Sequence, residues 1–200
     1  MIKRLFDLLL AGLSLTILSP LLVAIAILLL LELPEPIFWV SPRVGKDGRI
    51  FNLYNFRTMK LNDQNQKQFT AIGRFIRNYS LDHLPQLFNV IEGNMSLIGF
   101  RPPLPKEVDL TDPDWQTILT IKPGMFSLAI LGLATEYNSS SYKIKNQLEL
   151  EYVRQYSTIV DFQILLKSIG GWITSQGNIK ARGNPSVNIV KYTQKDKHKN

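Results

Sequence analysis

The pattern of apolar positions divides the chain into two unequal parts. Residues 8–31 hold no charged side chain over 24 positions and are almost wholly aliphatic. A helix needs about 20 apolar residues to cross the hydrocarbon core of a bilayer. After the Leu-Pro-Glu-Pro stretch at 33–36, apolar and polar residues mix as they do in a folded domain. The pattern therefore predicts a membrane helix followed by one folded domain.

A Ser19-Pro20 pair lies near the middle of this apolar run. Proline removes a helix hydrogen bond and clashes with the preceding turn, so the segment is either a kinked single span or a helix–break–helix. Lys3 and Arg4 precede the run, and the part that follows is also net basic. Because basic segments stay on the cytoplasmic side, the charges favour a re-entrant hairpin whose ends emerge on one face.

The pattern after residue 36 predicts short elements rather than one long array. A strand hairpin is expected from 37–40 and 50–56 around a Gly-Lys-Asp-Gly turn, and a polar loop from 61–68. Ser80 is expected to cap a helix at 81–91 with an apolar stripe at positions 84, 87, 88 and 91. Further helices are expected at 71–77 after a Thr70 cap, from Pro113 to before Lys122, at 142–156 and at 159–175.

The last of these helices is strongly amphipathic. Its apolar face either packs on the core or lies on the membrane surface. We divide the chain into a membrane anchor at 1–33, a folded cytosolic domain at 34–180 and a basic tail at 181–200.

Charge and composition narrow the classes of function. The chain has 23 basic and 16 acidic residues, a formal net charge of +7, no cysteine and two histidines. Disulfides and thiolate metal sites are excluded, and two histidines argue against a zinc site. A basic balance suits anionic lipid or phosphorylated substrates. The basic residues are scattered outside the tail, so no nucleic-acid partner is expected.

One cluster of residues has the composition of a phosphoryl-transfer site. Asp82 lies in the first turn of the expected helix at 81–91, after Arg74 and Arg77, and Arg101 lies in a proline-rich loop beyond it. A carboxylate can attack phosphorus to form an acyl phosphate, and guanidinium groups neutralise the phosphate that repels it. The alternative is that Asp82 is only a favourable charge at a helix N-terminus and that the arginines serve solubility or lipid contact.

The chain resembles the monotopic phosphoglycosyl transferases, also called bacterial sugar transferases. The resemblance runs from about residue 3 to 122 and more loosely to 167. It rests on short segments that occur together and in order, among them Ser-Leu-Asp at 80–82 and Lys-Pro-Gly at 122–124. The matching segments are 3–7, 19–20, 43–45, 56–59, 72–77, 80–82, 84–90, 93–99, 101–102 and 122–124.

The resemblance implies a fold and a reaction. The fold would be a re-entrant membrane helix carrying a small, mostly helical α/β domain on the cytoplasmic face of the bacterial inner membrane, with interfacial helices. The enzyme would move a sugar 1-phosphate from a nucleotide diphosphate sugar to polyprenyl phosphate through a covalent aspartyl intermediate, with Mg²⁺ as cofactor. The resemblance also implies membrane lipid as a partner and is compatible with a homodimer.

The resemblance also assigns roles to individual residues. Asp82 matches the nucleophile and metal ligand, Arg77 and Arg101 match phosphate-binding positions, and Arg57 matches a further basic position. Ser19 and Pro20 match the break in the membrane helix.

The chain departs from the family pattern at the site itself. Asp82-His83 stands where the family has Asp-Glu, and imidazole is a poor ligand for Mg²⁺. Phe100-Arg101-Pro102 replaces Pro-Arg-Pro, and residues 126–130 replace a more polar run. Three hypotheses follow: a transferase, a degenerate relative that serves as a non-catalytic binding or regulatory subunit, and a basic membrane-surface or nucleic-acid binder. The retained aspartate and arginines favour the first, whereas His83 favours the second.

Overall fold

The computed structural model describes residues 2–33, 36–61, 66–133, 136–137 and 139–174. Within these residues the fold is mostly helical, with three small two-stranded sheets, as expected for a mostly helical α/β chain. The tail predicted at 181–200 lies outside the described residues. The elements are α1 (Ile2–Glu32), β1 (Phe38–Val44), η1 (Lys46–Gly48), β2 (Ile50–Phe56), β3 (Met59–Leu61), β4 (Lys67–Phe69), α2 (Ala71–Asn78), η2 (Leu81–His83), α3 (Gln86–Glu92), β5 (Ser96–Ile98), η3 (Pro105–Glu107), α4 (Pro113–Ile118), β6 (Gly124–Phe126), α5 (Leu128–Leu133), α6 (Tyr142–Arg154) and α7 (Thr158–Thr174).

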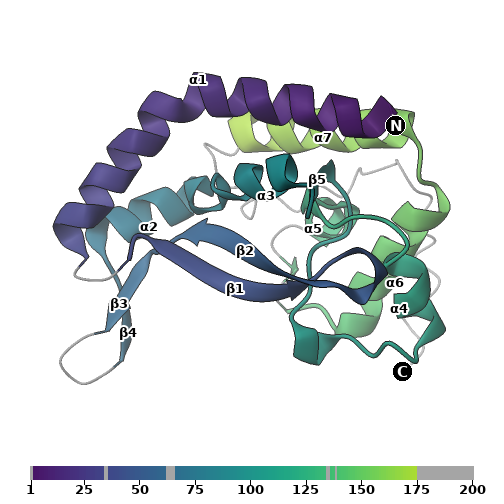
Figure 1. Cartoon of the computed structure of the whole chain (residues 1–200). Helices are drawn as coiled ribbons and strands as arrows, with labels where there is room; N and C mark the ends of the chain where they lie inside the picture. The colour runs from purple at the N-terminus through teal and green to yellow at the C-terminus, as the bar shows by residue number, and fades with distance from the viewer. Residues whose placement is uncertain (1, 34–35, 62–65, 134–135, 138, 175–200) are drawn as a thin grey trace.

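The apolar segment forms one bent helix rather than two helices separated by a break. α1 is helical throughout with Pro20 inside it, and Figure 1 shows the bend near its middle. Ser19 Oγ donates to the carbonyl of Thr16 at 2.8 Å, so the hydroxyl is satisfied within the helix. A proline removes only one backbone hydrogen bond, so the helix bends at this residue and continues through the aliphatic residues on both sides. Of the described helices, α1 is the one long and apolar enough to cross a membrane by length and composition.

Both halves of α1 pack on the same folded domain. Ala11 in the first half is buried in the main core cluster. Ile25 and Leu29 in the second half are buried in another cluster with Phe56 and Ile76. The opposite face of α1 leaves a series of large apolar side chains exposed, among them Leu5, Leu9, Leu13, Ile17 and Leu31.

Polar contacts fasten the two ends of α1 as well. Arg4 donates to the carbonyls of Val90 at 2.6 Å and Ile91 at 3.0 Å, near the C-terminus of α3. At the other end, the carboxylate of Glu32 accepts from the backbone N–H groups of Ala71 and Ile72, at 2.7 and 3.1 Å. These N–H groups have no partner within α2, so Glu32 caps a second helix.

Two further ties involve buried charge. Asp7 is 3% exposed and accepts from Ser96 Oγ at 3.0 Å and from the backbone N–H of Leu97 at 3.1 Å. Lys3 forms an ion pair with Asp161 on α7 and donates to the carbonyl of Ile98 at 2.9 Å. The segment at 3–7, which matched the family, is therefore a set of anchors to the domain.

The predicted hairpin is confirmed and is longer than expected. β1 and β2 pair antiparallel from Phe38 opposite Phe56 to Val44 opposite Ile50. Its turn places Asp47 and Gly48 at positive φ. The predicted polar loop at 61–68 is partly wrong, because β3 and β4 pair antiparallel and include its two ends. Residues 62–65 of that loop lie outside the described residues.

The predicted helix at 81–91 is wrong in its first half. Ser80 has φ 56° and makes no side-chain cap, and the next three residues form the 3₁₀ turn η2. The α-helix α3 begins only after Pro85. Proline is suited to a helix start because the N–H that it lacks would have no partner there. The Thr70 cap, in contrast, is confirmed, since Thr70 Oγ1 accepts from Gly73 N at 2.8 Å.

The predicted apolar stripe of this helix is also partly wrong. Leu87 is buried as expected, but Phe88 and Ile91 are 45% and 38% exposed. Asn89 and Val90 are buried in their place. Asn89 donates to the carbonyl of Asn52 at 2.7 Å and accepts from Tyr54 N at 3.1 Å, so the buried face of α3 is fastened to β2.

The helix α7 presents a different face to the core from the apolar one. Asp161, Ile164 and Ser168 are buried, whereas Phe162 and Leu166 are about half exposed. The core-facing interpretation of the amphipathic stripe is therefore wrong for these residues. Figure 1 shows α7 running beside the N-terminal half of α1. The side chains after residue 171 are outside the described ones.

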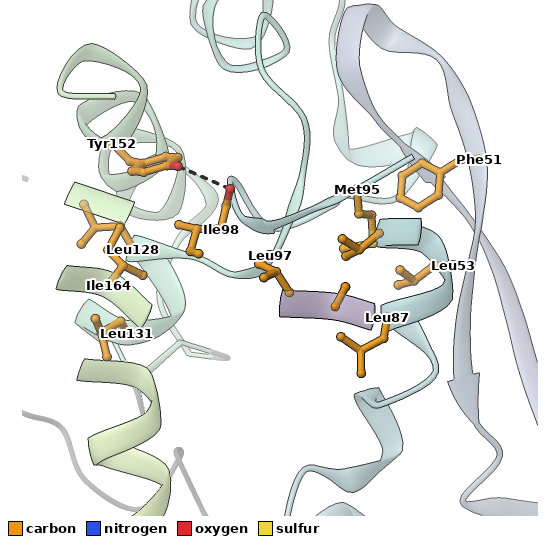
Figure 2. Close-up of a cluster of buried hydrophobic side chains, with 12 residues drawn as sticks. Phe51, Leu53, Leu87, Met95, Leu97, Ile98, Leu128, Leu131, Tyr152 and Ile164 are labelled. Atoms are coloured by element: carbon orange, nitrogen blue, oxygen red, sulfur yellow. Dashed lines mark hydrogen bonds between the residues drawn. The ribbon is translucent and has the colours of Figure 1, made fainter. Parts of the chain in front are cut away.

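The main core lies where α1, β2, α3, β5, α5, α6 and α7 meet. Figure 2 shows side chains converging from β2, α3, β5, α5, α6 and α7, with Tyr152 donating to the carbonyl of Ile98 at 3.4 Å. The backbones of Gly99 and Gly124 approach so closely that a Cβ on either would overlap with the other strand. This contact holds the loop that leads to Arg101 against the start of β6.

Candidate active site

The candidate nucleophile, Asp82, is buried in the 3₁₀ turn η2. Asp82 is 6% exposed, and no described residue donates a hydrogen bond to its Oδ1 atom. Nε2 of the neighbouring His83 lies 3.9 Å from Oδ1. A buried carboxylate oxygen without a donor is costly, so such a group in a native fold calls for a functional explanation.

Backbone strain adjoins this turn. Ser80 is a non-glycine residue with φ 56° in the left-handed region. Such residues cost on the order of 1 kcal/mol or more and persist where the surrounding structure requires them. The strained turn carries the chain from α2, which bears Arg77, directly into η2, which bears Asp82.

His83 is held against β2 by two amide side chains. Its Nδ1 lies 3.0 Å from Asn55 Oδ1 and 3.1 Å from Gln86 Nε2. Gln86 Nε2 also donates to Asn55 Oδ1 at 2.8 Å. The sequence does not mark Asn55 or Gln86 as site residues. Gln86 lies in the family-matching segment 84–90 and three residues after His83, on the same face of a helical turn.

Arg77 lies on α2 and Arg57 directly after β2, and both elements pack against η2. Arg57 follows β2 directly and stacks over the ring of Trp39, 5.4 Å from its centroid. Arg77 lies over the ring of Phe69 at 5.3 Å, and its NH1 is 3.5 Å from Thr58 Oγ1. Because η2 packs against both β2 and α2, these two arginines belong to the neighbourhood of Asp82.

Arg101 has its contacts elsewhere. Its guanidinium stacks over Tyr137 at 5.0 Å, and it lines a pocket of about 270 Å³ with Arg43 and Lys145. Trp39 pairs with Asn55 of the His83 network, and Arg43 lies four residues further along β1. At about 3.3 Å per residue, this places the Arg43 backbone about 13 Å from that of Trp39. The structure therefore distributes the predicted phosphate-binding residues over two neighbouring areas. Ser19 and Pro20 lie within α1, and neither lines this pocket.

Comparison with known proteins decides the family. Residues 1–175 match the model of the family described as bacterial sugar transferase. The chain belongs to the bacterial sugar transferase family. The resemblance predicted from the short motifs is thus confirmed.

Three relatives illustrate the similarity. The UDP-N-acetylgalactosamine-undecaprenyl-phosphate N-acetylgalactosaminephosphotransferase of Aeromonas hydrophila is 36% identical over 190 residues, 88% of this chain and 44% of that protein. The exopolysaccharide production protein ExoY of Sinorhizobium fredii is 31% identical over 88% of this chain and 87% of its own length. A Bacillus subtilis protein named as a putative undecaprenyl-phosphate N-acetylgalactosaminyl 1-phosphate transferase is 44% identical over 113 residues.

The coverage differs between these bacterial sugar transferases. The chain spans 44% of the Aeromonas protein and 40% of the UDP-galactose-lipid carrier transferase of Erwinia amylovora, but most of the Sinorhizobium protein. It therefore corresponds to a part of the longer relatives.

The residues of this bacterial sugar transferase site are compatible with Mg²⁺ that is held in part by substrate. The described residues contain no group of three His, Cys, Asp or Glu side chains that could hold a metal ion by themselves. Mg²⁺ is commonly bound through one or two carboxylates together with substrate phosphates. Asp82 supplies one such carboxylate, with an oxygen that has no donor among the described residues. His83 is not a suitable Mg²⁺ ligand, so a donor diphosphate would have to complete the coordination.

Proposed function

We propose that this protein transfers a sugar 1-phosphate from a nucleotide diphosphate sugar to polyprenyl phosphate, and so initiates synthesis of a surface glycan. The observation that carries the proposal is the buried Asp82 carboxylate, whose Oδ1 atom receives no hydrogen bond from the described residues. Its turn packs against β2, which Arg57 follows directly, and against α2, which bears Arg77. The names of the relatives, which specify UDP-sugars and undecaprenyl phosphate, support the same reaction.

The proposed reaction has two displacement steps at phosphorus. In the first, Asp82 Oδ1 attacks the phosphorus that bears the sugar, the bond to the nucleoside monophosphate breaks, and that group leaves with the bonding electron pair. In the second, an oxygen of polyprenyl phosphate attacks the same phosphorus and releases Asp82. The guanidinium groups reduce the repulsion between the carboxylate and the phosphates. Mg²⁺, when bound through Asp82 and the diphosphate, would neutralise further negative charge.

His83 occupies the position of the family glutamate in this mechanism. An imidazole held by Asn55 and Gln86 does not replace a hard oxygen ligand, so we expect weaker metal binding than with glutamate. His83→Glu should therefore raise the rate of the first step. If His83 acts instead as a general base towards the incoming carrier, the variant should slow the second step and the covalent intermediate should accumulate.

The same proposal places the protein on the cytoplasmic face of the bacterial inner membrane, with α1 as a re-entrant helix. Support comes from the polar ties of Arg4 and Glu32, which hold opposite ends of α1 on one domain. The exposed apolar faces of α1 and α7, which run side by side in Figure 1, would both meet lipid. Because the chain has no cysteine, single cysteines at positions 2 and 190 can be labelled selectively. Reactivity from opposite faces of the membrane would rule out this topology.

The chemical test is the mass of the intact protein. After incubation with a panel of nucleotide sugars and Mg²⁺ in the absence of carrier, the wild type should gain the mass of one phospho-sugar. Asp82→Asn should form no adduct, because an amide does not attack phosphorus here. Asp114→Asn, an exposed aspartate on α4, is the matched control and should behave as the wild type.

A degenerate, non-catalytic relative is the second candidate function, and the replacement of the family glutamate by His83 favours it. This candidate predicts that the wild type forms no adduct with any sugar and binds no nucleotide, and that His83→Glu gains no activity. Nucleoside monophosphate release by the wild type would exclude it.

A further inference from the structure

The last residue of α1, Glu32, binds the N-terminus of another helix. Its Oε1 accepts from Ala71 N at 2.7 Å and its Oε2 accepts from Ile72 N at 3.1 Å. The next N–H group of α2, that of Gly73, donates to Thr70 Oγ1 at 2.8 Å. One local residue and one residue of α1 therefore share the N–H groups that have no partner within α2.

The charge of Glu32 is unfavourable for its own helix. The C-terminus of a helix carries partial negative charge and repels a carboxylate, whereas the N-terminus of a helix attracts one. Glu32 ends α1 and lies at the start of α2, and Figure 1 shows these two helix ends close together. The contact between the two helices, and not α1 itself, therefore explains a carboxylate at this position.

The helix that Glu32 caps leads directly into the turn that bears Asp82. Near its start, a Cβ on Gly73 would lie 2.1 Å from the carbonyl oxygen of Thr58, so α2 is pressed against the segment that follows β2. At its other end, Ser80 N donates to the carbonyl of Arg77 at 3.2 Å. Because α2 also packs against η2, the position of α2 determines the position of Asp82.

An apolar cluster connects the second half of α1 to the same turn. Its buried members are Ile25, Leu29, Leu33, Phe56 and Ile76. Leu81, which directly precedes Asp82, packs against this cluster. The turn that bears Asp82 and the end of α1 thus share apolar contacts, and Glu32 adds a charged one.

The second step of the proposed reaction depends on where Asp82 lies relative to the membrane. A nucleotide diphosphate sugar reaches the site from water, whereas the apolar chain of polyprenyl phosphate holds its phosphate at the bilayer surface. An oxygen of this phosphate has to come within about 3–3.5 Å of the phosphorus on Asp82. A shift of Asp82 relative to α1 should therefore affect the second step more than the first.

We propose that Glu32 is a positioning residue for the transfer to polyprenyl phosphate. Its two hydrogen bonds fix α2, and through α2 the turn with Asp82, to the end of α1. The proposal rests on the proposed function, because it concerns the discharge of the aspartyl intermediate. In this discharge an oxygen of polyprenyl phosphate forms a bond to phosphorus, the bond from phosphorus to Asp82 Oδ1 breaks, and its electron pair returns to the carboxylate.

The two steps are measured separately on the full chain in lipid nanodiscs. Adduct formation is followed by intact mass with the panel of nucleotide sugars, and discharge is followed after a short-chain polyprenyl phosphate is added. Glu32→Gln loses the charge and one of the two acceptors for α2. It should form the adduct within about threefold of the wild-type rate but discharge it about tenfold more slowly, as expected for loss of a hydrogen bond to a charged group.

Glu92→Gln is the matched control for the loss of a carboxylate at a helix end. Glu92 is the last residue of α3, is exposed, and accepts from Asn94 Nδ2 at 3.0 Å. Both steps should proceed at the wild-type rate in this variant.

A second variant breaks the same contact from the side of α2. Ala71 is the exposed first residue of α2, and Thr70 before it has φ −72° and ψ 164°, which suits a residue that precedes proline. Ala71→Pro removes the N–H that binds Glu32 Oε1 and favours the start of the helix. It should slow discharge by about threefold or more without lowering the melting temperature, so a weaker α2 would not account for the result.

The outcomes separate this proposal from the transfer reaction itself. Slower discharge with near-normal adduct formation in Glu32→Gln supports the positioning role. Equal slowing of both steps, or discharge at the wild-type rate in Glu32→Gln or in Ala71→Pro, would overturn it and leave the transferase intact. A wild type that forms no adduct with any nucleotide sugar would contradict the proposed function and, with it, this role of Glu32.

Discussion

Replacing Glu149 by glutamine tests whether the burial of this carboxyl group makes the stability of the fold depend on pH. The carboxyl group is buried, and Arg101, Tyr137 and Tyr152 interact with it electrostatically. Burial raises its pKa from 4.5 to about 7, although the Arg101 N–H, the Ser127 hydroxyl and the Arg101 charge all act to lower it. The folded protein therefore holds this proton over a pH range in which the unfolded chain has released it.

The sign of the pH dependence follows from this difference. The folded state binds more protons than the unfolded state between pH 4.5 and about pH 7, so the stability contributed by Glu149 falls as the pH rises through that window. One pKa unit corresponds to about 1.4 kcal/mol, so the loss amounts to about 3 kcal/mol above pH 7. Glutamine carries no charge at any of these pH values and should remove this slope.

The assay is thermal unfolding of both proteins in the same detergent at pH 5, 6, 7 and 8. The melting temperature of Glu149→Gln relative to wild type should rise with pH, by about 5 °C or more between pH 5 and pH 8. Glu151→Gln, on the same helix with a partly exposed side chain, is the control and should show a constant difference. A constant difference for Glu149→Gln as well would refute the reasoning.

Three further substitutions test how α1 and the core are held together. Gly124→Ala should destabilise the fold by about 3 kcal/mol or more, because its Cβ would overlap with backbone, whereas Gly12→Ala has open space and should not, as chemical denaturation can measure. Lys3→Met should cost about 2–3 kcal/mol by leaving the buried carboxylate of Asp161 without its cation, and a variant as stable as wild type would contradict the assigned anchor. Pro20→Leu should straighten a 24-residue apolar stretch to about 36 Å, enough to span the ~30 Å hydrocarbon core, and cysteine labelling of both ends should then find them on opposite faces.

Several features of this protein follow from local sequence alone. A run of 24 uncharged, mostly aliphatic residues predicts a membrane-length helix, because backbone groups in lipid must be satisfied within the segment. The Gly-Lys-Asp-Gly turn between β1 and β2 and the Thr70 cap of α2 depend on a few neighbouring residues, and both are confirmed. The ordered set of short motifs was sufficient for the family.

The sequence did not predict which face of a helix is buried, because this depends on the segments that pack against it. Periodicity showed that α7 has an apolar face, but it does not say whether that face meets protein or lipid. The structure turns Asp161 inward, because Lys3 from α1 and the hydroxyl of Tyr152 bind its carboxylate. In a protein that meets lipid, the usual rule of apolar side chains inside is no longer sufficient.

The candidate site divides in the same way. Asp82 could be chosen from the sequence because its motif is local, but the network of His83, Asn55 and Gln86 joins β2 to η2 and α3. Glu149 was not identified, since a glutamate on a charged helix is ordinarily exposed. It is buried on α6, where the backbone N–H of Arg101 donates to its Oε1. Only the tertiary structure decides which distant segments exclude water from one carboxyl group.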